Sequence, residues 1–169
     1  MFQHILIPLD GSPRAETPLE YGIGLAKEFG GRITLLQAVT LVPDQWGWGH
    51  TERMRAQQMT AAQEYLETCA QTVRASGVNV QSVVLPGEAS KAILNFTVEK
   101  GVDAIVMNSH GLGGLAGYVF GSVAEKVVKA AACPVLVLHE RPSREELEEQ
   151  QEREAASFDQ LMSASWDRL

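Results

Sequence analysis

The sequence predicts an α/β fold: a doubly wound, five-stranded parallel sheet with strand order 3-2-1-4-5 and helices on both faces. Short, nearly continuous apolar runs such as residues 4–9 indicate strands that are buried on both faces. These runs alternate with amphipathic stretches, and glycines close the first three of those stretches, as expected of β-α units joined by right-handed crossovers. A length of 169 residues corresponds to about one domain.

The first strand and the first helix follow directly from the opening residues. The apolar run 4–9 predicts a strand, and Pro8 lies near its end because proline has no N–H to donate. Ser12 and Pro13 then predict a helix start, with Ser12 at the cap and Pro13 at the first helical position. The apolar pattern continues to Phe29, and Pro18 inside it either bends the first turns or shifts the start of the helix.

The remaining elements continue the alternation. A long connection, residues 40–51, holds Trp46, Trp48 and His50, which could form a lid over a ligand, a surface for a partner or a cover for the edge of the core. The expected strands are 32–39, 80–85, 102–107 and 134–138, and the expected helices are 51–75, 88–100 and 121–132.

Charge and composition exclude several classes of function. The formal net charge of −7 and a pI near 5.1 argue against a general binder of nucleic acid or of anionic membranes, since either needs a basic face. No apolar run is long enough to cross a bilayer, and residues 1–10 do not resemble a signal peptide, so we expect a cytoplasmic protein. Cys69 and Cys133 lie far apart without metal-ligand spacing, and we expect both to be free thiols.

The end of the chain differs from the rest. Eight acidic and three basic residues fall between 143 and 169, which leaves the preceding part nearly neutral. We therefore divide the chain into a main domain, residues 1–140, which holds the candidate binding site at residues 104–126, and an acidic amphipathic helical tail, residues 141–169. Apolar residues in the second half of the tail form a helical stripe, which could dock on the domain or on another subunit, or leave the last turns disordered.

A glycine-rich stretch, residues 104–126, is the strongest candidate for a binding site. An apolar run is followed by an uncharged loop with four glycines, and Gly121 and Ser122 then open a helical pattern. Backbone N–H groups in such a loop and at a helix tip favour a phosphate ligand. Two alternatives remain: the loop is only flexible, or Ser122 and Glu125 form a capping box that satisfies the helix start without a ligand.

The fold predicts where such a ligand would bind. In a doubly wound sheet, ligands bind beyond the carboxyl ends of the strands, where the strand order reverses. If the first and fourth strands are neighbours there, residues 8–10 and 107–111 line the crevice. Asp10 could bind a ribose or only shape an Asx turn. His110 is expected to orient or pack, and Ser122 to donate a hydrogen bond, since no base with triad logic accompanies it.

Three motifs at these positions resemble the universal stress protein family. They are Pro8-Leu-Asp-Gly-Ser12 after the first strand, Met107-Asn-Ser-His-Gly111 after the fourth, and Gly121-Ser122 at a helix start before the sequence CPVLVL. The resemblance covers residues 1–139. ATP-binding members carry G-x2-G-x9-G-[ST], which Gly111, Gly121 and Ser122 match, whereas Asn108 stands at the first glycine position.

The resemblance implies a role for each matching residue. Asp10 would bind the ribose, and Pro8, Ala38 and Met107 would line the adenine slot. The amides of Gly111, Ser122 and Val123 and the hydroxyl of Ser122 would hold the phosphates, while Asn108 would contact the ribose through its backbone. An uncharged loop leaves phosphate charge unneutralised, so Mg²⁺ is expected to bind through the phosphates and not through protein side chains.

We therefore expect a stress-response or signalling module that binds ATP, or another adenine nucleotide such as AMP or ADP, with little or no hydrolysis. The lysine of a P-loop is absent from the glycine-rich loop. The alternatives are a dimer of the same fold that binds no nucleotide and acts through an unidentified protein partner, and a slow ATPase. We expect a homodimer through the fifth strand, because pairing with its twofold copy would cover a short apolar edge.

Overall fold

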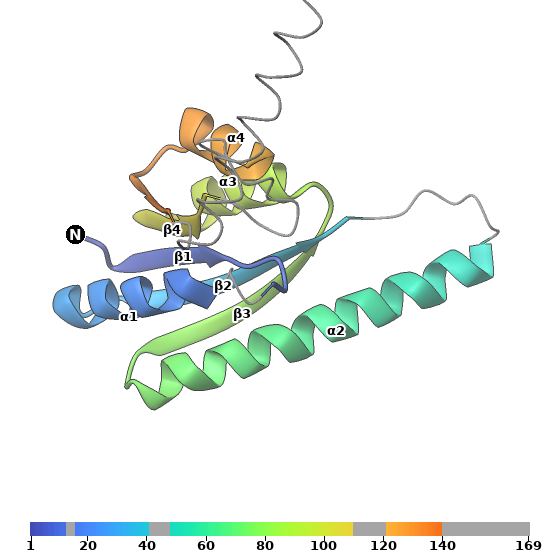
Figure 1. Cartoon of the computed structure of the whole chain (residues 1–169), viewed down its shortest axis with the longest axis horizontal. Helices are drawn as coiled ribbons and strands as arrows, with labels where there is room; N and C mark the ends of the chain where they lie inside the picture. The colour runs from blue at the N-terminus through green and yellow to red at the C-terminus, as the bar shows by residue number, and fades with distance from the viewer. Residues whose placement is uncertain (13–15, 41–47, 110–120, 140–169) are drawn as a thin grey trace, which may run out of the picture.

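The structure, a computed structural model, describes residues 1–12, 16–40, 48–109 and 121–139, with the backbone alone at residues 48–51. Five parallel strands form one sheet in the order β3-β2-β1-β4-β5, which confirms the predicted topology (Figure 1). The strands are β1 (His4–Pro8), β2 (Arg32–Val39), β3 (Asn79–Pro86), β4 (Ala104–Asn108) and β5 (Val135–Leu138).

Helices cover both faces of the sheet in pairs. Within the described residues, α1 and α2 lie on one face and α3 and α4 on the other, as Figure 1 shows. This arrangement follows from the chain order, because α1 and α2 lead from β1 across the sheet to β2 and β3, whereas α3 and α4 lead in the opposite direction to β4 and β5. The helices are α1 (Thr17–Phe29), α2 (Trp48–Ala75), α3 (Ala89–Lys100) and α4 (Ser122–Ala130).

The start of α1 differs from the prediction. The helix begins at Thr17, with Glu16 at the N-cap and Pro18 in its first turn, so Ser12 is not its cap and the predicted helix start at Ser12 was wrong. The hydroxyl of Ser12 instead donates to Asp10 at 2.7 Å. Pro18 fits the first turn because an N–H there has no partner within the helix. Pro13 lies outside the described residues.

The start of α2 also differs. The helix begins at Trp48 instead of Thr51, so Thr51 lies inside it and is not its cap. No proline occurs between residues 48 and 75, so nothing in the sequence prevents the earlier start. The backbones of Trp48 and His50 belong to this first turn, whereas Trp46 lies outside the described part of the chain.

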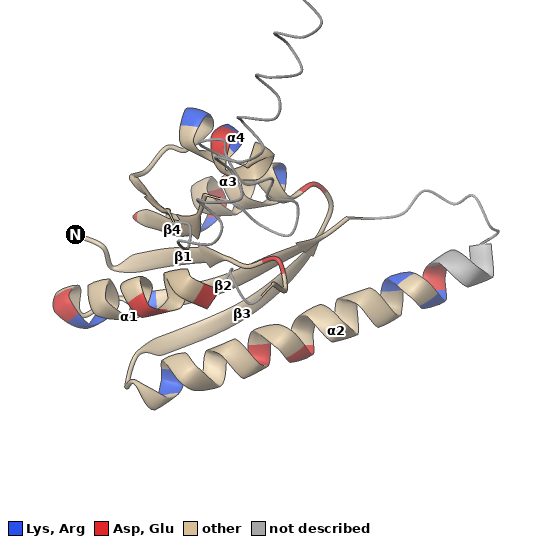
Figure 2. Ribbon diagram, viewed as in Figure 1, with Lys and Arg blue, Asp and Glu red and all other residues tan. Residues whose placement is uncertain are grey.

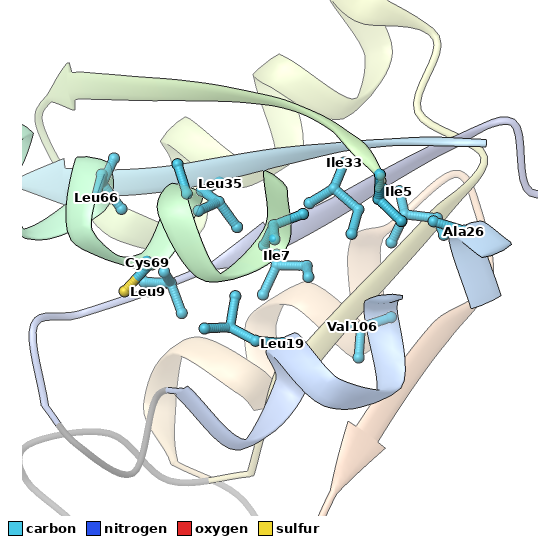
Figure 3. Close-up of a cluster of buried hydrophobic side chains, with 13 residues drawn as sticks. Ile5, Ile7, Leu9, Leu19, Ala26, Ile33, Leu35, Leu66, Cys69 and Val106 are labelled. Carbon is cyan, nitrogen blue, oxygen red and sulfur yellow. The ribbon is translucent and has the colours of Figure 1, made fainter. Parts of the chain in front are cut away.

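Two hydrophobic clusters hold the layers together. The cluster of Figure 3 joins β1, β2 and β4 to α1 and α2 through side chains such as Ile7, Leu35 and Leu66, which are 0% exposed. The second cluster joins the opposite face to α3 and α4 through Leu6 and Ile105, also 0% exposed. Burying each such side chain stabilises the folded state by roughly 1.5–3 kcal/mol. The packed sheet therefore holds the ends of its strands in fixed positions.

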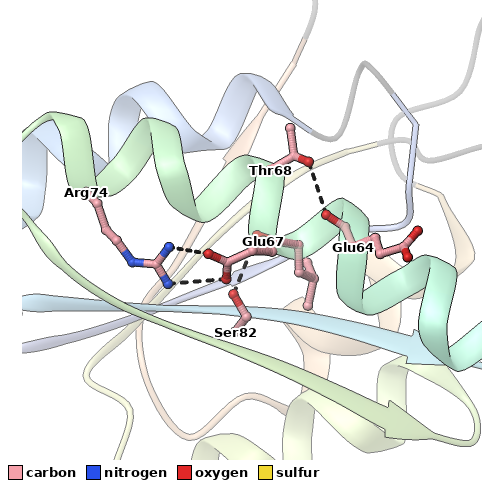
Figure 4. Close-up of polar contacts among 6 residues, drawn as sticks. Glu64, Glu67, Thr68, Arg74 and Ser82 are labelled. Atoms are coloured by element: carbon pink, nitrogen blue, oxygen red, sulfur yellow. Dashed lines mark hydrogen bonds and ion pairs between the residues drawn. The ribbon is translucent and has the colours of Figure 1, made fainter.

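The contact between α2 and β3 also includes polar groups (Figure 4). The hydroxyl of Ser82 on β3 donates to the carbonyl oxygen of Leu66 on α2 at 3.5 Å. On the outer side of the helix, Arg74 and Glu67 form a bidentate ion pair two turns apart, and this pair lowers the pKa of Glu67. Both side chains are largely exposed, so solvent screens the pair.

The amino-terminal edge of the sheet holds a buried histidine. His4 is 5% exposed, and its Nε2 lies 2.9 Å from the hydroxyl oxygen of Thr34 on β2. Arg32 donates from Nη2 to Nδ1 of His4 at 3.1 Å, and the amides of Gln3 and His4 donate to Asp103 Oδ2, each at 2.9 Å. Burial and the Arg32 charge lower the pKa of His4.

Three further observations concern the described residues as a whole. Cys69 is buried and Cys133 half-buried, and both are free thiols, as predicted. Within the described ranges, none of the helices combines the length and the apolarity that crossing a membrane requires. The proposed tail, residues 141–169, and the boundary that sets it apart lie outside these ranges.

Candidate functional site

The predicted crevice lies where the strand order reverses. β1 and β4 are parallel neighbours, with Ile5 aligned to Ala104 and Leu6 to Ile105. The chain leaves β1 towards α1 on one face and leaves β4 towards α4 on the other, so the two connections diverge from the same edge of the sheet. This divergence is the geometry in which open α/β sheets bind ligands.

The three residues expected to line an adenine slot share one face. Met107 belongs to the cluster beneath α3 and α4, together with Leu6 and Leu36. Pro8 and Ala38 each lie two residues beyond a member of that cluster, and side chains two apart in a strand point to the same face. The structure therefore brings Pro8, Ala38 and Met107 together on adjacent strands, on the face that carries α4.

Asp10 lies directly beyond β1, in a tight turn. Its Oδ1 accepts hydrogen bonds from the amide of Ser12 at 3.0 Å and from the hydroxyl of Ser12 at 2.7 Å. These bonds form the Asx turn that was one of the two interpretations of Asp10. They also hold the carboxylate at the carboxyl edge of the sheet, so the turn and a ligand role for Asp10 are compatible.

The turn depends on Gly11 and approaches Gln37. Gly11 has φ of +86°, where a side chain is strained, and a Cβ there would lie 3.4 Å from Nε2 of Gln37. The other amide atom of Gln37, Oε1, is buried and has no hydrogen-bond partner within the described residues. A buried polar atom of this kind is uncommon, and the sequence did not single out Gln37.

The start of α4 is joined to the end of β4. The amide of Gly121 donates to the carbonyl oxygen of Ser109 at 2.6 Å, which places the tip of α4 beside the crevice. Gly121 is the N-cap, with an extended backbone, and among the described residues no side chain caps the helix there. Uncapped amides at a helix tip favour an anion.

The predicted capping box is not formed. Ser122 is the first helical residue instead of the cap, and the carboxylate of Glu125 accepts from Lys129 at 2.6 Å. The interpretation in which Ser122 and Glu125 satisfy the helix start between themselves is therefore wrong. The side chain of Ser122 is exposed at the tip of α4, followed by half-buried Val123, so the phosphate interpretation of this helix start stays a prediction. The other alternative, a loop that is only flexible, concerns residues outside the described ranges.

Asn108 stands at the position where the signature G-x2-G-x9-G-[ST] has its first glycine. Val106, two residues earlier, packs in the cluster beneath α1 and α2, so the Asn108 side chain is directed to that face. Met107 and Ser122 belong to the opposite side of the sheet, so the asparagine side chain does not cover their face. Gly111 and His110, the other predicted members of this loop, lie outside the described residues.

A serine and histidine pair joins the ends of β4 and β5. Ser109 is 3% exposed, and its Oγ lies 2.7 Å from Nδ1 of His139. The amide of Ser109 also donates to the carbonyl oxygen of Leu138 at 2.9 Å. Two bonds therefore fix the residue from which the glycine-rich loop departs. The sequence carried no signal for this pair, because its members are 30 residues apart.

An ion pair connects α3 to α4 beside the crevice. Nζ of Lys126 on α4 donates to Oε1 of Glu88, the N-cap residue of α3, at 2.6 Å. Ser90 donates to the same carboxylate oxygen at 2.8 Å. The hydrogen bonds from Lys126, first, and from Ser90 lower the pKa of Glu88 to about 2. Figure 2 shows acidic residues on the turns that follow β1 and β3, and both signs of charge on α4.

Comparison with known proteins gives the family. The model of the universal stress protein family matches residues 1–139. A universal stress protein of Methanocaldococcus jannaschii, MJ0531, is 31% identical over 150 residues, which cover 86% of each chain. The chain belongs to the universal stress protein family. A second member, YxiE of Bacillus subtilis, is 28% identical over 82% of this chain and 99% of its own length.

Solved structures agree with this assignment. The protein MJ0577, solved as a test case of structural genomics, superposes with a TM-score of 0.78 at 26% identity, over 85% of this chain and 99% of its own. The universal stress protein UspA of Lactobacillus plantarum superposes with a TM-score of 0.71 at 21% identity, over 82% and 98% of the two chains. Both cover the sheet and its helices, so the doubly wound architecture is that of the family.

Proposed function

We propose that this universal stress protein binds an adenine nucleotide in the crevice between the carboxyl ends of β1 and β4, and that it prefers ATP to AMP or ADP. In this proposal it serves as a stress-response or signalling module of the cytoplasm, with little or no hydrolysis. One observation carries the proposal: the Asp10 turn directly follows β1, and the tip of α4 is bonded to the end of the neighbouring strand β4, at the strand reversal. A carboxylate and a row of amides at this place suit a ribose and its phosphates.

Each part of the nucleotide has a matching set of residues. Adenine lies against Pro8, Ala38 and Met107, which share the α3 and α4 face. The carboxylate of Asp10 accepts from the ribose, and the backbone of Asn108 lies beside it. The phosphates bind the amides of Ser122 and Val123 and the hydroxyl of Ser122 at the helix tip, with Gly121 and Gly111 allowing close approach.

Proteins of the same fold support the choice of ligand class. Solved universal stress proteins have been obtained in complex with cAMP, with AMP and with dAMP. Their identity to this chain is 18–22%, so the likeness establishes the fold, and our choice of ligand rests on the residues of this chain. In our proposal Mg²⁺ binds through the phosphates, because the groups that hold them are amides and a hydroxyl, and the carboxylate of Glu125 in the first turn of α4 pairs with Lys129.

Adding a negative charge at the helix tip tests the proposal. Thermal unfolding with and without millimolar Mg-ATP should show a stabilisation of the wild type that Ser122→Asp abolishes, because a carboxylate repels phosphates at this place. Asn79→Asp adds the same charge at the opposite edge of the sheet, and it should keep the stabilisation. Absence of any stabilisation or binding of the wild type at millimolar nucleotide overturns the proposal. Steady phosphate release that Asp10→Ala removes would show a slow ATPase instead.

The edge strand β5 favours a second candidate function. Within the part of the chain that the structure describes, β5 pairs with β4 on one side only, and Leu136 on it is 42% exposed. We propose that two chains pair through this strand, which would cover the exposed edge. A dimer that binds no nucleotide and acts on an unidentified protein partner would still form in Ser122→Asp. Sedimentation equilibrium that finds a monomer contradicts the dimer.

A further inference from the structure

The ion pair between Glu88 and Lys126 lies beside the proposed phosphate site. Lys126 follows Ser122 by one helical turn, so the two side chains share a face of α4, about 6 Å apart along the axis. Side chains in a helix lean towards its amino terminus, which directs the long lysine side chain towards the tip. Lys126 is therefore positioned within reach of a phosphate at Ser122 as well as of Glu88.

Glu88 can release Lys126 without losing its other partners. Its second oxygen, Oε2, lies 3.5 Å from Nζ of Lys91, and Ser90 donates to Oε1 at 2.8 Å. The side chains of Glu88 and Lys126 are 42% and 59% exposed, so water replaces part of any lost interaction. Exposed ion pairs of this kind are weak, whereas charge-assisted bonds to a phosphate are among the stronger ones.

Glu88 is also connected to the proposed adenine slot. It begins α3 directly after Gly87, whose amide donates to the carbonyl oxygen of Val39 at 2.9 Å. Val39 adjoins Ala38, one of the residues expected to line the slot. The Glu88 and Lys126 pair therefore joins the tip of α3 to the second turn of α4, on the face where the nucleotide is proposed to bind.

We propose that Lys126 determines the choice among adenine nucleotides: it exchanges Glu88 for the β- or γ-phosphate of bound ATP. This inference rests on the proposed nucleotide site and adds its preference for ATP over AMP. The α-phosphate is held by the amides at the tip of α4 in both nucleotides. AMP has no further phosphate for Lys126 to reach, so AMP leaves the Glu88 pair intact.

Substitutions of Lys126 and of Glu88 should then have opposite effects on the affinity for ATP. Lys126→Gln should weaken ATP binding by about tenfold, the usual effect of losing a hydrogen bond between charged groups, and change AMP binding by less than twofold. Glu88→Gln should tighten ATP binding, because Lys126 no longer has a competing carboxylate. It should leave AMP binding unchanged. A merely structural pair would give losses of the same sign in both variants.

Matched controls exist on the same helix. Lys129→Gln and Glu125→Gln remove the same charges from an ion pair of the same length, 2.6 Å, one turn apart on α4. Calorimetric titrations with Mg-ATP and with AMP should therefore show little change in either control. Equal shifts in Glu125→Gln and Glu88→Gln would show a general charge effect and overturn the role of Lys126.

A spectroscopic measurement follows the exchange directly. NMR titration of the Glu88 carboxyl should show that ATP, and not AMP, raises the pKa of Glu88 from its value of about 2, because Lys126 has moved away. If the wild type binds ATP and AMP but the variants shift both equally, this inference fails while the proposed function stands. If the wild type binds neither nucleotide, both fail.

Discussion

The amide of Gly121 donates a hydrogen bond to the carbonyl oxygen of Ser109, with 2.6 Å between nitrogen and oxygen. The bond joins the tip of α4 to the end of β4 across residues 110–120. The topology brings the end of β4 and the tip of α4 to the same edge of the sheet, and this bond brings the two into direct contact. The phosphate interpretation of the glycine-rich stretch depends on this contact, because a helix tip farther from β4 could not share a ligand with Asp10.

The carboxylate of Asp10 should contribute more to nucleotide affinity than the hydrogen bond from the Ser12 hydroxyl within the Asx turn. Asp10→Ala removes the carboxylate proposed to bind the ribose, and we expect ATP affinity to fall by about tenfold or more, as for the loss of a charged hydrogen-bond partner. Ser12→Ala removes only the hydroxyl bond of 2.7 Å within the turn and should change affinity by about twofold at most. Calorimetry on both variants checks this. Equal losses would show that the turn, and not the ligand contact, is what binding requires.

The pair of Ser109 and His139 should contribute to stability. Ser109→Ala deletes a buried hydroxyl 2.7 Å from Nδ1 of His139, and the free energy of unfolding should fall by about 1 kcal/mol. The backbone bond from Gly121 to Ser109 remains, so nucleotide affinity should change little. Urea unfolding of Ser109→Ala, His139→Ala and the double variant gives the coupling energy. Purely additive effects would mean that the pair contributes nothing.

His4 should make stability depend on pH. Burial, first, and the charge of Arg32 on β2 lower its pKa, while the carbonyl of Lys100 and the carboxylate of Asp103 oppose that shift. The unfolded chain, with a histidine pKa of about 6.5, then binds a proton more readily than the folded chain, so stability decreases as pH falls below that value. His4→Gln should flatten the pH dependence of the free energy of unfolding between neutral and mildly acidic pH. An unchanged slope contradicts the assignment.

Two glycines should respond to alanine in opposite ways. A Cβ at Gly31 would lie 2.4 Å from the backbone oxygen of Phe2, which cannot move away easily, so Gly31→Ala should destabilise the fold by about 1–3 kcal/mol. A Cβ at Gly24 in α1 would meet nothing within 4 Å, and Gly24→Ala should stabilise the helix by about 0.5–1 kcal/mol. Thermal unfolding compares them directly, and a destabilising Gly24→Ala would contradict the packing.

Much of the fold could be predicted because its signals are local and repeated. Apolar runs, amphipathic stretches and glycine helix ends recur along the chain, and the strand reversal follows from their alternation. Gly30 and Gly101 end α1 and α3 with φ near +60°, as the pattern indicated. The start of α1 was mispredicted because Ser12 can serve either a helix cap or an Asx turn, and local sequence does not distinguish the two.

The candidate site was only partly predictable for a related reason. Pro8, Ala38 and Met107 follow from strand periodicity, and the structure places them on one face. The pairs Glu88 with Lys126 and Ser109 with His139 join residues 38 and 30 positions apart, and no periodicity connects such residues. These pairs depend on how α3 packs against α4 and on how β4 aligns with β5. The roles of Asp10, Ser122 and Val123 in binding remain predictions.

Backbone amide NMR during titration with Mg-ATP tests the central claim most directly. If the tip of α4 holds the phosphates, the amides of Ser122 and Val123 should shift and saturate together with those of residues 10–12, while amides at the amino-terminal edge near His4 stay in place. Saturable binding that leaves the Ser122 and Val123 amides unchanged, or no shift at millimolar nucleotide, would contradict the account.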